Sequence, residues 1–517
     1  MPPLALRPVA LVVFLVLFVF VTILGFLGAR WRRGDLDTLH EWGLGGRRFG
    51  TLISWFLLGG DLYTAYTFVA VPALIYGAGA IGFFAIPYTV IIYPVMFAVF
   101  PKLWRVCKRH GFLTAPEFVR GRYESRGLSL AVAITGILAT MPYIALQLVG
   151  MEVVLAALGL EGHGIMADIP LFIAFIVLAA FTYASGLRAP AMIAVVKDLL
   201  IYITVIAAAV IIPMQLGGWA KIFAAVPPQK LLLPAPHGAS LGSYSAYATL
   251  ALGSALALFL YPHSVTAILS ANGSRVIKRN AVLLPAYSLV LGLLALLGFM
   301  AIAEGVGHEP QFAAGFAQYK GNFAVPALML KAFPEWFAGL AFAAIAIGAL
   351  VPASIMSIAT ANIFTRDIYK AFLKPGATEL EESRMAKLIS LIVKAGALGF
   401  ILALPAETAI QFQLLGGIWI IQTLPAVFCG LSRLRLRAGA LLLGWACGMA
   451  VGTLMAASAG FKSAIFPLDL GGFLAPGYAA LYALIVNLAV SFAVSSLQNR
   501  LGGPEGREMA AARRLEI

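Results

Sequence analysis

Residues 50–77 read GTLISWFLLGGDLYTAYTFVAVPALIYG, a stretch long and apolar enough to cross a bilayer, with Gly59, Gly60 and Asp61 near its middle. A charge at the bilayer centre costs roughly 2.5–3.5 kcal/mol on insertion scales, and paired glycines weaken a helix at the same place. The combination is typical of a discontinuous transmembrane helix, whose freed backbone groups and carboxylate line a binding site. The alternative is a glycine-rich packing face on which Asp61 pairs with a neighbouring helix.

The composition places the whole chain in a membrane. Of its 517 residues, 61% are hydrophobic and 11% are charged, unlike a soluble protein. Hydropathy predicts an all-α polytopic protein with about 13 transmembrane helices. We expect these helices near residues 8–29, 50–77, 79–101, 128–158, 168–186, 190–215, 244–270, 280–304, 336–364, 388–405, 409–430, 437–459 and 475–498. The longest loops, near 216–243 and 305–335, are expected to hold at most short interfacial helices.

The basic residues lie mainly on one side of this topology. Most of the 36 Lys and Arg residues fall in alternate loops and in the C-terminal tail, chiefly in segments 30–48, 102–126, 275–279, 366–387, 433–437 and 500–514. The positive-inside rule then predicts a multi-pass protein of a bacterial-type inner (plasma) membrane, with the N-terminus outside and the C-terminus in the cytoplasm. Topology and contact with anionic membrane lipid account for the net charge of +14, which therefore does not indicate a nucleic-acid partner.

Other function classes lack the motifs that they need. The three cysteines, Cys107, Cys429 and Cys447, have no metal-ligand spacing, so we expect no metal site and no disulfide framework. The sequence has no HExxH and no P-loop motif, which argues against an enzyme. A membrane sensor on the same scaffold would need an output domain, whereas residues 499–517 form only a short predicted cytoplasmic tail.

Two groups of five predicted helices, residues 50–215 and 244–430, follow one another. An odd number of helices per group makes the second group enter from the opposite face, which gives an inverted repeat. Each group opens with an interrupted helix, and the second interruption is expected from Gly253-Ser254 through Tyr261-Pro262-His263. Paired interruptions at matching positions indicate a transporter site at the repeat interface. Residues 8–29, which lack a signal-peptide cleavage pattern, and residues 437–498 would then form peripheral helices.

Several stretches resemble the sodium:solute symporter family, over about residues 8–498. They include the break before Asp61, the turn SGLRA at 185–189 and the run TRDIY at 365–369. The segments at 40–47, 55–67, 139–150, 346–353 and 413–420 are most similar to the bacterial monocarboxylate permeases of that family. The resemblance implies a five-plus-five inverted-repeat core that works by alternating access. It also implies uptake of short monocarboxylates such as lactate, pyruvate, propionate or butyrate, and in some members alanine.

The resemblance leaves the coupling ion open. Sodium-coupled members usually carry a Ser/Thr pair fifteen and sixteen residues before the Asp of a closing Asp-x-Tyr. Counted back from Asp367, those positions hold Val351 and Pro352, which offer no side-chain oxygen. Hard cations prefer oxygen ligands, and Ser354 and Ser357 are the candidate substitutes. Coupling to protons is therefore favoured over sodium, a sodium-coupled symporter of another small organic acid or amino acid is the alternative, and no cofactor is expected.

The candidate site residues come from both interruptions and from the helices beside them. Backbone N–H groups, hydroxyls and aromatic rings suit a small carboxylate with an apolar tail. The substrate set is Gly59, Gly60, Tyr63, Tyr143, Gln147, Ser254, Tyr261 and His263. Asp61 is the first candidate for ion coupling, as a cation ligand or a proton acceptor. His263, a possible proton relay, and the pair Ser354 and Ser357 follow.

Lys197, Asp198 and Lys394 also fall inside predicted spans. Lys197 and Asp198 are adjacent, and neighbours on a helix diverge by about 100°, so they need not pair with each other. Each is expected either to face the substrate path or to pair with another helix. Lys394 is close enough to the cytoplasmic end of its span to extend its ammonium to the interface.

Overall fold

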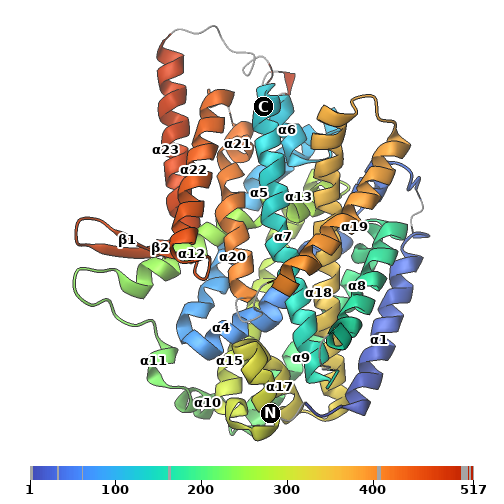
Figure 1. Cartoon of the computed structure of the whole chain (residues 1–517), viewed down its shortest axis with the longest axis vertical. Helices are drawn as coiled ribbons and strands as arrows, with labels where there is room; N and C mark the ends of the chain where they lie inside the picture. Colours follow the sequence, from blue (N-terminus) through green and yellow to red (C-terminus); the bar gives the residue numbers. More distant parts are fainter. Residues whose placement is uncertain are drawn as a thin grey trace.

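The structure is a computed structural model that describes residues 4–31, 34–60, 62–160, 165–403, 409–432, 434–501, 511 and 514–515. Most of its long helices run side by side along the long axis of the molecule (Figure 1). They are α1 (Pro8–Leu27), α5 (Ala85–His110), α7 (Arg126–Ala157), α8 (Ile165–Ser185), α9 (Arg188–Gln215), α15 (Pro285–Ala303), α18 (Glu335–Ile363), α19 (Glu379–Ala403), α20 (Ala409–Ile420), α22 (Ala438–Ser458) and α23 (Ala479–Arg500).

The described helices have the length and composition of a membrane protein. Nine helical stretches among these residues are long and apolar enough to cross a bilayer, or ten if the bent pair α12 and α13 counts as one span. A nearly all-helical membrane protein is thus confirmed. The number of crossings stays a prediction, because α3 (Thr51–Gly60) stops after ten residues at a break and α19 begins with acidic residues.

Helix α18 lies at the centre of the bundle. Its most apolar window is buried throughout, and it packs against α1, α7, α9 and α19. Helix α1, in contrast, leaves Val12, Val16 and Ile23 more than half exposed. Because lipid tails are as apolar as these side chains, the contrast separates a protein-enclosed helix from one that faces lipid.

The first interrupted helix is present where the sequence predicts it. Helix α3 ends at Gly60, and helical structure resumes with the π-turn η2 (Tyr66–Ala70) and continues as α4 (Val71–Ala78). Glycines have low helix propensity, and Gly59 is also required for packing, since a Cβ there would overlap the ring of Tyr287. Asp61 lies outside the described residues.

The second interruption lies later in its span than expected. Helix α12 (Gly242–Leu258) is continuous through Gly253 and Ser254, so the prediction of a break at those two residues is wrong. A Cβ at Gly253 would lie 2.6 Å from the ring of Tyr478, which shows that this glycine serves close packing. The break spans residues 259–261 and precedes α13 (Pro262–Leu269), which is bent by 48° from α12. Proline has no N–H to donate and favours the first position of a new helix.

A β-hairpin replaces the start of the last predicted span. Strands β1 (Ile465–Asp469) and β2 (Leu474–Tyr478) pair antiparallel, with Asp469 opposite Leu474. Gly471 and Gly472 in the turn between them have φ of 70° and 94°, a conformation that side chains disfavour. The prediction of a helix from residue 475 is therefore wrong, and α23 begins at Ala479.

Short helices fill the connections, as expected for the two longest loops. Those loops contain α10 (Trp219–Ala225), α11 (Pro228–Leu231), η4 (Val306–His308), η5 (Pro310–Phe312), α16 (Ala313–Tyr319), η6 (Lys320–Phe323) and α17 (Ala324–Ala332). The remaining elements are α2 (Leu39–Leu44), η1 (Gly45–Arg47), η3 (Gly79–Phe84), α6 (Ala115–Tyr123), α14 (Ser274–Leu283), η7 (Phe364–Leu373), η9 (Ile421–Thr423), α21 (Leu424–Phe428) and η10 (Cys429–Leu431).

Candidate functional site

An ammonium group from α9 lies at the first break. The Nζ atom of Lys197 donates hydrogen bonds to the carbonyl oxygens of Gly60, at 2.9 Å, and Tyr63, at 3.1 Å. Gly60 is the last residue of α3, where carbonyl groups lose their partners within the helix. A Cβ at residue 60 would lie 2.9 Å from Nζ, so a glycine permits this close approach. The interruption therefore exposes two carbonyl oxygens, and a lysine binds both.

A carboxylate completes the surroundings of this ammonium. Asp198 Oδ1 lies 2.8 Å from Lys197 Nζ, and both side chains are fully buried. The other carboxylate oxygen, Oδ2, accepts a 2.6 Å hydrogen bond from the hydroxyl of Tyr287 on α15. The hydroxyl of Tyr63 donates in turn to the carbonyl of Tyr287, at 3.0 Å. These contacts tie α9, α15 and the first break together in one polar network.

Aromatic rings enclose this network. The ring of Tyr287 lies 4.6 Å, centroid to centroid, from the rings of both Trp55 and Tyr63, and the ring of Tyr202 lies 5.9 Å from that of Tyr63. Such pairs add about 0.5–1.5 kcal/mol each beyond the area that they bury. The predicted residue Tyr63 thus holds the break against α9 and α15.

Side-chain oxygens already accept hydrogen bonds from backbone N–H groups at the first break. The N–H of Ala65 donates to Gln147 Oε1 at 3.1 Å, and the N–H of Tyr66 donates to Thr64 Oγ1, also at 3.1 Å. The N–H of Thr64 donates to Thr67 Oγ1 at 3.0 Å. In this conformation these three amides bind protein groups, so they do not form the anion site that the sequence suggested for the first break. The predicted residue Gln147 positions the backbone of the break.

Three predicted residues meet at the second break. Tyr143 of α7 stacks edge-on against Tyr261 and His263, with ring centroids 5.4 Å apart in both pairs, and Tyr261 lies 5.3 Å from His263. All three side chains are buried. Since Tyr143 and Gln147 are four residues apart and lie on one face of α7, this face contacts both breaks.

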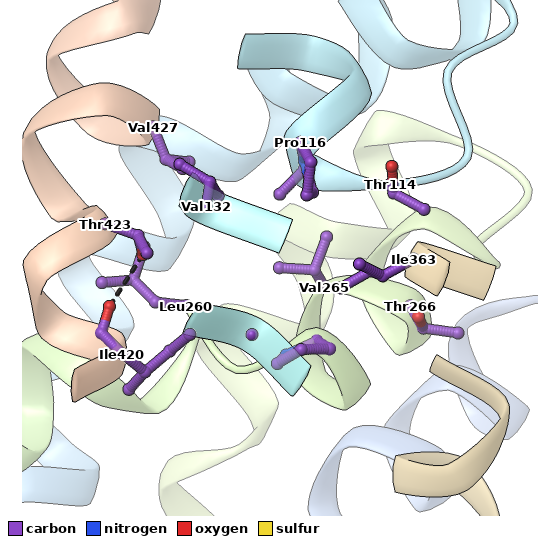
Figure 2. Close-up of a pocket in the computed structure, with 13 residues that line it drawn as sticks. Thr114, Pro116, Val132, Leu260, Val265, Thr266, Ile363, Ile420, Thr423 and Val427 are labelled. Carbon is purple, nitrogen blue, oxygen red and sulfur yellow. Dashed lines mark hydrogen bonds between the residues drawn. The ribbon is translucent and has the colours of Figure 1, made fainter. Parts of the chain in front are cut away.

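A pocket continues from the second break toward the loop before α6. Its lining comes from the break itself, from α6, α7, α13 and the end of α18, and from α20, η9 and α21 (Figure 2). The lining residues are Thr114, Ala115, Pro116, Val132, Gly136, Leu260, Pro262, Val265, Thr266, Ile363, Ile420, Thr423 and Val427. Figure 2 shows mainly aliphatic side chains with three threonine hydroxyls among them. The walls of this pocket are therefore mainly apolar.

The remaining predicted residues are not brought to the first break by the structure. The hydroxyl of Ser354 lies 3.1 Å from Thr182 Oγ1 of α8, and Ser357 donates to the carbonyl of Ser354 at 2.8 Å. Ser254 is buried within α12, and its hydroxyl has no hydrogen-bond partner among the described residues. The first candidate for ion coupling, Asp61, lies outside the described residues.

Two predictions about charged residues are corrected by the structure. Lys197 and Asp198 do pair with each other, because the long, flexible lysine stem turns back toward its neighbour. Lys394 is fully buried on α19 and its Nζ has no hydrogen-bond partner among the described residues, so it does not extend to the interface. The signal for the first network was present in the sequence, as two adjacent opposite charges inside an apolar span.

Buried ion pairs also join the ends of several helices. Arg188, the first residue of α9, binds the carboxylate of Glu41 on α2, which also lies 2.8 Å from Arg48. Arg366 of η7 lies 2.7 Å from Glu117 of α6 and 2.9 Å from Glu382 of α19. These ion pairs connect α2 to the start of α9, and connect η7 to α6 and α19.

Comparison with known proteins identifies the family. The model of the sodium:solute symporter family matches residues 42–429. A monocarboxylate transport permease protein of Rhizobium johnstonii is 53% identical over 493 residues, which cover 94% of this chain and 96% of the relative. An uncharacterized symporter of Bacillus subtilis is 32% identical, with 86% of each chain covered.

A solved structure has the same fold. The substrate-bound outward-open state of a Na+-coupled sialic acid symporter superimposes with a TM-score of 0.75, covering 95% of this chain and 98% of that one at 14% identity. The resemblance drawn from the sequence is thus confirmed, and the relatives are transporters and not enzymes. This multi-pass membrane protein belongs to the sodium:solute symporter family.

Proposed function

We propose that this chain is a symporter that imports short-chain monocarboxylates, such as lactate, pyruvate or propionate, together with protons across a bacterial plasma membrane. The observation that carries the substrate class is the 53% identity, over nearly the whole of both chains, to a relative named for monocarboxylate transport. The sialic acid symporter, at 14% identity, supports the fold alone.

Two features favour a proton over sodium as the coupling ion. Val351 and Pro352 of α18 present no side-chain oxygen to a cation. The two carbonyl oxygens at the first break already bind the ammonium of Lys197. A metal ion would have to displace that ammonium, and the ammonium would then remain as a like charge beside it.

The second break is the proposed substrate site. The pocket that continues from it toward the loop before α6 is the proposed inward path. The rings of Tyr143, Tyr261 and His263 would bound the apolar tail, and the N-terminus of α13 favours negative charge near its backbone. From there the pocket leads to Thr114, in the loop that precedes α6. Along this wall the hydroxyls of Thr114 and Thr423 donate to Asp367 Oδ2 and to the carbonyl of Ile420, so a passing carboxylate would have to compete with these protein acceptors for the one O–H of each.

The proposed membrane topology rests on the distribution of basic residues and on the two interrupted helices. The N-terminus lies outside and the C-terminus in the cytoplasm, because the most basic loops lie on one side. About 13 helices cross the membrane, and residues 50–215 and 244–430 form the two halves of an inverted repeat. Each half begins with an interrupted helix, α3 with α4 and α12 with α13, which supports this division.

Uptake by the purified protein in liposomes tests the proposal. Labelled pyruvate should accumulate when a pH gradient, acidic outside, is imposed without sodium, and a sodium gradient at equal pH should not drive accumulation. Accumulation driven by sodium alone would establish the sodium-coupled alternative instead. Equal uptake under every ion condition, or none, would refute symport of monocarboxylates altogether.

A further inference from the structure

The surroundings of Lys197 have the composition of a cation site. Two backbone carbonyl oxygens and one carboxylate oxygen lie 2.9, 3.1 and 2.8 Å from a single nitrogen. Carbonyl and carboxylate oxygens are the ligands that replace the hydration shell of a hard cation in proteins. Here they surround an ammonium, which is a monovalent cation with three N–H donors on the end of a covalent tether.

The described side chains of this site are shielded from water. Lys197, Asp198, Tyr63 and Tyr287 are all buried. Of the helices that pack against α9, the sequences of α1, α3, α15 and the interior of α18 contain no charged residue, and that of α8 contains Asp168. The side chain of Asp168 on α8 and the residue after Gly60, Asp61, lie outside what the structure describes. The titratable groups that face Lys197 in the described part are therefore Asp198 and the hydroxyls of Tyr63, Tyr202 and Tyr287.

The protonation state of Lys197 sets the strength of its hydrogen bonds to the first break. As an ammonium it makes charge-assisted hydrogen bonds, which are roughly twice as strong as neutral ones, and it balances the buried charge of Asp198. As an amine it keeps two N–H donors and a lone pair. One of the three oxygens then faces a lone pair, and Asp198 loses its counter-charge in a medium where an unpaired carboxylate costs several kcal/mol. Loss of the proton thus loosens the contacts between α9 and the first break.

We propose that Lys197 is the coupling residue of this transporter: its ammonium is a resident cation between the two halves of the first interrupted helix, and binding and release of its proton lock and unlock that helix. On release the N–H bond breaks, its electron pair stays on nitrogen, and the proton passes to water on the cytoplasmic side. One proton then accompanies one monocarboxylate anion, so the cycle moves no net charge. This inference rests on the proposed function and names its coupling site.

The experiment compares two lysine variants in the same vesicles. Lys197→Gln removes the titrating charge and keeps an amide donor. Lys394→Gln is the matched control, because Lys394 is the other fully buried lysine in the described part of the chain. Each variant is measured in two assays: accumulation of labelled pyruvate under a pH gradient, and counterflow of labelled against unlabelled pyruvate at equal pH, which requires no net movement of protons.

We expect Lys197→Gln to keep counterflow and to lose accumulation, and Lys394→Gln to keep both. Lys197→Arg supplies a cation that does not deprotonate. It is expected to behave as Lys197→Gln does, and it replaces that variant if Lys197→Gln does not fold. Wild-type accumulation by either folded Lys197 variant would overturn the inference, as would loss of counterflow together with accumulation. Failure of the wild type in both assays would refute the proposed function instead, so the two failures are distinguishable.

Discussion

Replacing Asp198 by asparagine removes one charge from the network at the first break and keeps nearly the same shape. In the wild type, Oδ1 of Asp198 lies 2.8 Å from Lys197 Nζ and Oδ2 accepts a 2.6 Å hydrogen bond from Tyr287. Both charged side chains are fully buried. In Asp198→Asn the ammonium keeps its carbonyl partners and loses the carboxylate that lies 2.8 Å away.

The expected cost follows from the burial of this pair. Removal of one partner from a buried ion pair typically destabilises a protein by about 3–5 kcal/mol, because the remaining charge stays in a medium of low dielectric constant. Replacement of both partners by apolar groups of similar volume is often nearly neutral. We therefore expect Asp198→Asn to lose about 3–5 kcal/mol and the double variant, with Lys197→Met added, to recover most of that loss.

Unfolding of the purified protein in mixed micelles, with the fraction of denaturing detergent as the variable, measures these free energies. The two single variants and the double variant complete a cycle whose coupling term isolates the pair. Additive effects of the two substitutions, or a loss below about 1 kcal/mol in Asp198→Asn, a value typical of exposed pairs, would refute the buried-pair argument.

Three other substitutions are expected to change stability in the same unfolding assay. Lys394→Met should raise the unfolding midpoint, because it replaces a buried ammonium that has no hydrogen-bond partner among the described residues; a lower midpoint would indicate an anionic partner. Gly59→Ala should lower the free energy of unfolding by about 1–3 kcal/mol, because the added methyl group overpacks against the ring of Tyr287. Gly77→Ala is the control, and it should leave this free energy unchanged because no atom lies within 4 Å of the added carbon. Gln147→Leu should cost about 1–3 kcal/mol, since it leaves a buried amide of the first break unsatisfied, and an unchanged midpoint would contradict that role.

The sequence predicts most features that depend on hydropathy and on backbone chemistry. Gly59 and Gly60 mark the first interruption because they lower helix propensity, and Pro262 marks the second because it has no N–H. The sequence groups Tyr143, Tyr261 and His263 only as candidate substrate residues, and their contact at the second break comes from the packing of α7. Pattern reasoning fails at Gly253, where the glycine serves contact with Tyr478 and the helix continues.

Side-chain partners across helices are harder to predict. Lys197 and Asp198 point in different directions on an ideal helix, but a four-carbon stem is long enough to reach both its neighbour and the first break. Lys394 shows the opposite error, because its distance along the helix from the cytoplasmic end does not reveal that α19 packs against α7 and α18 and that the Lys394 side chain is buried. In both cases the packing of helices, which hydropathy does not encode, decides where the charge lies.

Proton flux during uptake is the most direct measure of proton-coupled import. Liposomes that contain the protein and a trapped pH-sensitive dye are given pyruvate outside, without sodium and with equal pH on both sides. The account predicts that the lumen acidifies together with the uptake of labelled pyruvate, faster than in protein-free liposomes. Uptake of pyruvate without acidification, or acidification that requires sodium, would contradict it.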